Sequence, residues 1–152
     1  MRPRIPRDRF LRASPCELQE NAEVKVSPFE TGHNYEALKY DFYLFGVNTG
    51  EAVIRFGDEI KWCTFFPVDE LPRPKYQWKM HGLGTLFQVM TLQEMAKEND
   101  LGSIVTHDRY CVTEERKAHL RKMGLQPGMT LEEYLQKSIA YANSKGFDFQ
   151  IS

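Results

Sequence analysis

The chain has 152 residues, of which 41% are hydrophobic and 27% charged, a composition that predicts one soluble globular domain spanning residues 1–152. The formal net charge is −1, and no apolar run approaches the roughly 18 residues of a membrane helix, so we expect neither a nucleic-acid-binding nor a membrane protein. The N-terminal segment lacks the apolar stretch of a secretory signal. Three cysteines without metal spacing predict reduced thiols, a cytoplasmic location and no metal site: Cys16, Cys63 and Cys111.

Residues 1–12 carry five arginines and one aspartate, a local charge of +4. Pro3 and Pro6 argue against a helix here. Two interpretations remain: a basic arm that contacts nucleic acid or an acidic partner, or a terminus that is solvated or packed on the surface. Because the rest of the chain is acidic, the second interpretation is preferred.

Alternating residues predict a strand at 23–26, ended by Pro28, and weak helical character follows at 29–38, which we expect to form an acceptor-side loop. The next part is β-rich. We expect an antiparallel meander of strands at 41–47, 51–56 and 60–66, joined by turns at 48–50 and 57–58. A segment containing Pro67, Pro72 and Pro74 separates the meander from the next element.

Two glycines, Gly82 and Gly84, precede the longest amphipathic segment, a helix expected over Leu83–Glu98. Glycines at a helix entrance expose backbone N–H groups without an obstructing Cβ, and the helix N-terminus carries partial positive charge. This combination suits a phosphate or pyrophosphate, although a tight turn that binds nothing has the same pattern. A strand at 102–107 and a helix opened by Thr113 and closed by Gly124 should follow.

This order of elements resembles the GCN5-related N-acetyltransferase (GNAT) superfamily. The acyl-CoA loop of that family, Arg/Gln-x-x-Gly-x-Gly/Ala, is similar to Lys79-x-x-Gly82-x-Gly84, and its helix ending in Gly-Phe is similar to Gly124-Leu125. The resemblance implies an α/β (α+β) fold, with a central, mostly antiparallel twisted sheet flanked by helices on both faces. It also implies that strand 102–107 runs parallel to a splayed strand 60–66.

The resemblance implies an acyl-CoA-dependent N-acyltransferase that moves an acetyl group from acetyl-CoA to an amine of a small molecule or protein. The pyrophosphate would be held by the N–H groups of residues 81–85 and by the charge of a lysine. The implied cofactor-binding residues are Lys79, His81, Gly82, Leu83, Gly84 and Thr85.

The family's usual general acid is a tyrosine four residues before the glycine that ends the second helix, and Leu120 stands there instead. Tyr110 and His107 are the nearest replacements. The competing interpretations are that Tyr110 is a packed aromatic residue and that His107 is a loop histidine bonded to backbone. The missing tyrosine also favours an alternative function, a GNAT scaffold of weak or no activity that binds a protein partner.

The C-terminal part predicts a third helix opened by a capping box, Thr130-x-x-Glu133, and stopped at Gly146. The strictly alternating segment 147–151 predicts a closing strand on the sheet. Neither the acceptor amine nor the choice between monomer and homodimer can be derived from these patterns.

Overall fold

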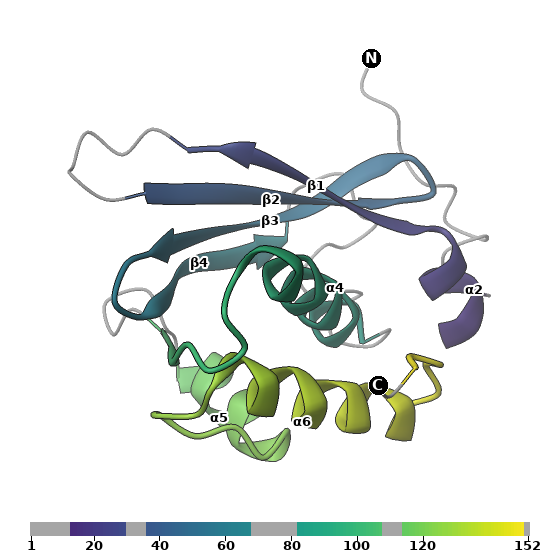
Figure 1. Ribbon diagram of the computed structural model, residues 1–152. Coiled ribbons are helices and arrows are strands. Elements are labelled where there is room, and N and C mark those ends of the chain that lie inside the picture. Colours follow the sequence, from purple (N-terminus) through teal and green to yellow (C-terminus); the bar gives the residue numbers. More distant parts are fainter. Residues whose placement is uncertain (1–12, 30–35, 68–81, 108–113, 151–152) are drawn as a thin grey trace.

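The computed structural model describes residues 13–29, 36–67, 82–107 and 114–150, which form an α+β fold with one mixed sheet and a layer of helices (Figure 1). The elements in chain order are α2 (Pro15–Glu20), β1 (Ala22–Pro28), β2 (Glu36–Leu44), β3 (Val47–Phe56), β4 (Ile60–Pro67), α4 (Leu83–Glu98), β5 (Val105–His107), α5 (Glu114–Lys122) and α6 (Leu131–Ser144).

The five strands are ordered β1-β2-β3-β4-β5 in one sheet. The pairs from β1 to β4 are antiparallel, as expected for a meander, and β4 pairs with β5 in parallel through Ile60↔Val105 and Trp62↔His107. The prediction that strands 60–66 and 102–107 run parallel in one sheet is therefore confirmed. The strand expected at 102–107 is shorter in the structure, where β5 comprises only Val105–His107.

The turn between β2 and β3 lies earlier in the chain than the sequence predicts. Phe45 and Gly46 form a two-residue turn with φ of 51° and 78°, the positive values that a tight hairpin needs. The expected turn at 48–50 is wrong because these residues lie within β3. There Phe42 pairs with Gly50 while Tyr43 pairs with Asn48, which leaves the intervening threonine as a β-bulge.

The expected helical character at 29–38 is wrong in its described part. Glu36–Leu44 is a strand, and the N–H of Phe29 donates to the carbonyl of Ala37 at 3.0 Å, which extends the ladder between β1 and β2. Residues 30–35 lie outside the described residues. The alternation of β2 places Tyr40, Phe42 and Leu44 in the core.

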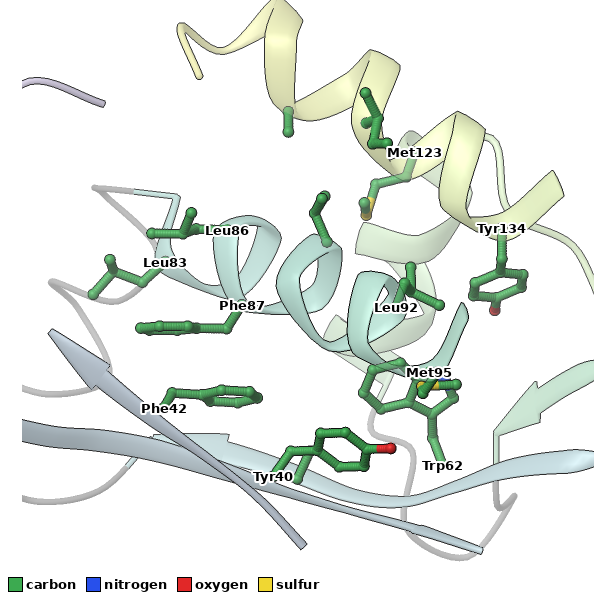
Figure 2. Close-up of a cluster of buried hydrophobic side chains, with 14 of the residues drawn as sticks. Tyr40, Phe42, Trp62, Leu83, Leu86, Phe87, Leu92, Met95, Met123 and Tyr134 are labelled. Carbon is green, nitrogen blue, oxygen red and sulfur yellow. The ribbon is translucent and has the colours of Figure 1, made fainter. Parts of the chain in front are cut away.

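Helix α4 begins and ends where its apolar stripe predicts and packs on the sheet, between the sheet and α6 (Figure 1). Phe87 stacks on Phe42 with ring centroids 4.5 Å apart, and Figure 2 shows this pair among the buried side chains. The expected helices on both faces are not found in the described chain: α4, α5 and α6 all lie on one side. The other face, here called the polar face, carries charged side chains on its central strands, since Lys39 pairs with Asp41 at 3.7 Å and with Glu51 at 3.8 Å. Ala37 and Val53 on the same face are buried.

The ends of the two last helices follow their predicted signals. Gly124, at φ 80°, ends α5 while the N–H of Leu125 donates to the carbonyl of Leu120 at 3.0 Å, the bond of a Schellman motif. Thr130 and Glu133 form the reciprocal capping box of α6. Thr113, the expected first cap of α5, lies outside the described residues.

The predicted closing strand is wrong over its described part, 147–150, which pairs with no described strand. The side chains do alternate, since Phe147 and Phe149 are buried. However, the amide of Asn143 bonds both backbone groups of Phe149, at 2.8 and 2.9 Å, and Gln19 does the same for Asp148, at 2.8 and 3.0 Å. These side-chain amides replace the partners that a neighbouring strand would supply.

Candidate functional site at the entrance of helix α4

The entrance of α4 is the described part of the candidate cofactor loop. Gly82 precedes the helix with φ 68° and no side-chain cap, and the first intrahelical bond runs from the N–H of Leu86 to the carbonyl of Gly82 at 3.0 Å. The N–H groups of Leu83, Gly84 and Thr85 therefore precede the intrahelical ladder. Leu83 is fully buried and Gly84 is half-buried.

The left-handed φ gives Gly82 a structural reason to be glycine. A Cβ on this residue would also meet the Phe147 ring, with Cε2 at 3.4 Å. The aromatic ring of the C-terminal segment thus lies directly beside the loop. Gly84 is different because its backbone is helical, a conformation that any residue except proline adopts easily.

The entrance of α4 lies at the carboxyl end of β4. Phe87, in the second turn of α4, stacks on Phe42, which pairs with Gly50. Gly50 in turn pairs with Pro67, the last residue of β4. A group held at the N-terminus of α4 would therefore lie near the end of this strand.

Thr85 is buried and its hydroxyl lies 3.2 Å from Nε2 of His119 on α5. His119 in turn meets the edge of the Tyr141 ring of α6 at 5.8 Å between centroids. The Thr85 side chain is therefore engaged between helices, and its contribution to a ligand would come from its backbone N–H. Sequence patterns do not point to His119, because its two partners lie on other helices.

His107 lies in a second, separate cluster. Its ring stacks on Trp62 at 5.6 Å between centroids, and its Nε2 is 3.0 Å from the hydroxyl of Tyr134 on α6. Burial lowers the pKa of His107 to about 3, with a further contribution from Arg116, so the imidazole is neutral at pH 7. Burial raises the pKa of Tyr134 to about 12.

The two clusters are at opposite ends of α4. Figure 2 shows Trp62 and Tyr134 beside Met95, whereas Leu83 lies at the other end of the helix. Along β4, Trp62 precedes Pro67 by five residues, about 16 Å of extended strand. The structure therefore does not bring His107 to the α4 entrance.

Three polar side chains join the helices near these clusters, of which Gln88 and Ser138 are buried and Arg116 is half-buried as a whole residue. Arg116 of α5 donates from Nη2 to Oε1 of Gln88, and Nε2 of Gln88 donates to Oγ of Ser138 at 3.1 Å. Burial lowers the pKa of Arg116 to about 10, which leaves it charged at neutral pH. This network connects α4, α5 and α6.

Lys79 and His81, and the catalytic candidate Tyr110, lie outside the described residues. Leu120, at the position of the family's tyrosine, is 8% exposed and belongs to the core. Within the described ranges, no group of histidine, cysteine, aspartate or glutamate side chains could hold a metal ion. None of the described helices combines the length and apolar character needed to cross a membrane.

Comparison of the chain with protein-family models, with curated proteins and with solved structures gives no match in any of the three.

Proposed function

We propose that this protein is an acyl-CoA-dependent N-acyltransferase of the GNAT type, which moves an acetyl group from acetyl-CoA to an amine of a small molecule or protein. One observation carries the proposal: α4 connects the parallel strands β4 and β5 and begins with Gly82 and a helical Gly84 at the carboxyl end of β4. A pyrophosphate suits this position because the N–H groups of the first turn precede the intrahelical ladder.

The proposed chemistry needs little more from the protein. Acetyl transfer from a thioester requires two reactants held together, a donor for the developing oxyanion and a path for the amine proton. The pyrophosphate would contact the N–H groups of residues 81–85, with charge from Lys79. A backbone N–H at 64–68, at the end of β4, would bind the oxyanion.

Of the two candidates for the general acid, Tyr110 is preferred. His107 fits the role less well, because its pKa of about 3 leaves the ring neutral at pH 7, without the acidic proton of an imidazolium, and its Nε2 lies 3.0 Å from the Tyr134 hydroxyl. The variant Tyr110→Phe should therefore lower turnover on the order of 10²–10⁴-fold. If Tyr110→Phe and His107→Ala both keep wild-type turnover, water protonates the leaving thiolate instead.

Two observations support a second candidate, a protein that keeps the scaffold and acts by binding a protein partner. Leu120 is buried where the family places its tyrosine, and the Phe147 ring lies 3.4 Å from the Cβ position of Gly82. A missing general acid and an aromatic ring beside the cofactor loop would both hinder catalysis. Neither feature would hinder the binding of a protein partner.

Calorimetric titration with CoA and acetyl-CoA tests the cofactor site on which the first candidate depends. The wild type should bind CoA, and Gly84→Val should abolish binding because a β-branched side chain blocks the approach of phosphate to the backbone. Gly57→Val is the matched control: its backbone φ is not left-handed, and its Cβ would meet nothing within 4 Å. Gly82→Val is unsuitable, because the φ of 68° strains any substitution there.

Circular dichroism and a thermal unfolding curve should show that Gly84→Val remains folded. Unchanged CoA affinity in this folded variant would mean that the glycine loop is a turn that does not contact the ligand. A folded wild type that binds neither CoA nor acetyl-CoA would rule out the acyltransferase and leave the scaffold protein.

A further inference from the structure

Among the described strands, β1 lies at one edge of the sheet, and its outer edge has a definite hydrogen-bonding pattern. The N–H of Phe45 donates to the carbonyl of Asn21 at 2.9 Å, and the N–H of Phe29 donates to that of Ala37 at 3.0 Å. Both bonds fall on the unbroken register between β1 and β2. Since bonded pairs alternate along an antiparallel ladder, the backbone groups of the even-numbered residues point away from β2: Ala22, Val24 and Val26.

The charges on β1 are complementary to those of a second β1 laid antiparallel to it. A two-fold axis at Val24 would place Glu23 of one chain opposite Lys25 of the other, twice. Both side chains are exposed. The same register pairs Val24 with its own copy and Ala22 with Val26, so the outward-pointing backbone groups meet each other.

Neighbouring registers are less favourable. Moving the axis to Val26 would place Val24 opposite Pro28, which has no N–H to donate, and Lys25 opposite Ser27. Moving it to Ala22 would place Val24 opposite Glu20, which is part of α2. Only the axis at Val24 pairs the central residues of β1 with each other and also places opposite charges face to face.

In the single chain, the side chain of Lys25 contacts the inner neighbour of β1, strand β2. Nζ of Lys25 lies 4.5 Å from the centroid of the Tyr43 ring, on the polar face of the sheet, and Lys25 pairs with Asp41 in the register of β2. In the pair of sheets, Lys25 would stand between Asp41 and the second copy's Glu23. Val26, 42% exposed, would gain a neighbour on the other face.

We infer that the outer edge of β1 binds a second copy of this chain, forming a symmetric dimer with one continuous sheet through antiparallel β1 strands centred on Val24. The surface is independent of the proposed acyl-CoA site, and its test does not require any ligand.

Sedimentation velocity over a concentration series tests the inference with the full chain. The wild type should show a dimer, and Val24→Pro should give a monomer, because proline removes an outward N–H at a position where an edge strand tolerates it. Circular dichroism should show that Val24→Pro is folded. A wild type that is monomeric at every concentration would overturn the inference.

A charge exchange tests the register, even where Val24→Pro fails to fold. Glu23→Lys and Lys25→Glu should each weaken the dimer about tenfold or more, since like charges would then face each other twice. An equimolar mixture of the two variants should restore it, because their strands carry opposite charges. Asp58→Lys makes the same charge change in the exposed bend after β3 and should have no effect. A dimer that resists both charge variants, or a mixture that is not restored, would assign association to another surface.

Discussion

Acidification should destabilise this protein through His107 well before its carboxylates titrate. The pKa of His107 is about 3 in the folded chain and takes its ordinary value of 6.5 on unfolding. Between these values the unfolded imidazole binds a proton that the folded one does not, so the free energy of unfolding falls as the pH falls. At 1.36 kcal/mol per pH unit, the loss between pH 6.5 and about pH 5 is about 2 kcal/mol.

Urea denaturation at several pH values measures this loss. Tryptophan fluorescence is a suitable signal because Trp62 stacks on the His107 ring. The variant His107→Gln keeps an amide near the Tyr134 hydroxyl but cannot titrate. Over the same pH interval, its unfolding free energy should fall by about 2 kcal/mol less than that of the wild type.

Among the described residues, two charged or titratable groups face the imidazole. Arg116 opposes its protonation, and Tyr134, with a pKa raised to about 12, stays neutral throughout the interval. Two results would contradict this prediction: equal pH slopes of the unfolding free energy for wild type and His107→Gln, or an NMR titration of His107 with its midpoint near 6.5. Either result would mean that water reaches the ring in the folded state.

Three further changes test the local structure, each by urea denaturation. Gly124→Ala should lower the free energy of unfolding by about 1 kcal/mol, because φ of Gly124 is 80°. Gly102→Ala, at a glycine without a positive φ, should lower it much less. Equal losses would contradict a left-handed residue at the end of α5. Thr130→Ala should cost about 1 kcal/mol by removing the cap of α6, and no loss would mean that the capping box is idle. Asn143→Ala should cost roughly 2 kcal/mol and speed hydrogen exchange at the N–H of Phe149; unchanged exchange would show that another group protects it.

The elements that the sequence predicted correctly are those with a local physical cause. The capping box of Thr130 and Glu133 satisfies donors within a single turn, and Gly124 supplies a left-handed residue where α5 ends. Helix α4 was located by the spacing of its own apolar side chains. The short helix α2 was missed, although Ser14 and Pro15 provide the cap and first-turn signals that identify a start.

The errors arise where a segment's partners decide its structure. Asn48-Thr49-Gly50 has the composition of a turn, but the register of β2 with β3 makes it a bulge and moves the turn to Phe45 and Gly46. The alternation of 147–150 correctly predicted which side chains are buried. It could not reveal that the amides of Gln19 and Asn143 would take the place of a neighbouring strand.

In the candidate site, too, features with a local cause could be predicted and features set by distant partners could not. The entrance of α4 could be located from its glycines, since a helix start is local. The pair Thr85 and His119, and the pair His107 and Tyr134, could not, because each joins residues at least 27 positions apart. The environment of His107 depends on Trp62, Tyr134 and Arg116, and no spacing rule connects three residues on separate elements.

The two glycines at α4 make different demands, and this difference separates a ligand site from a turn. Gly82 must be glycine for its φ of 68°, whether or not anything binds. Gly84 is helical, so alanine there should stabilise the fold by roughly 0.5 kcal/mol. If Gly84→Ala raises the midpoint of urea unfolding but weakens CoA binding, glycine at this position lowers the stability of the fold and serves ligand binding. If Gly84→Ala raises stability and leaves CoA affinity unchanged, close approach at this residue has no part in binding.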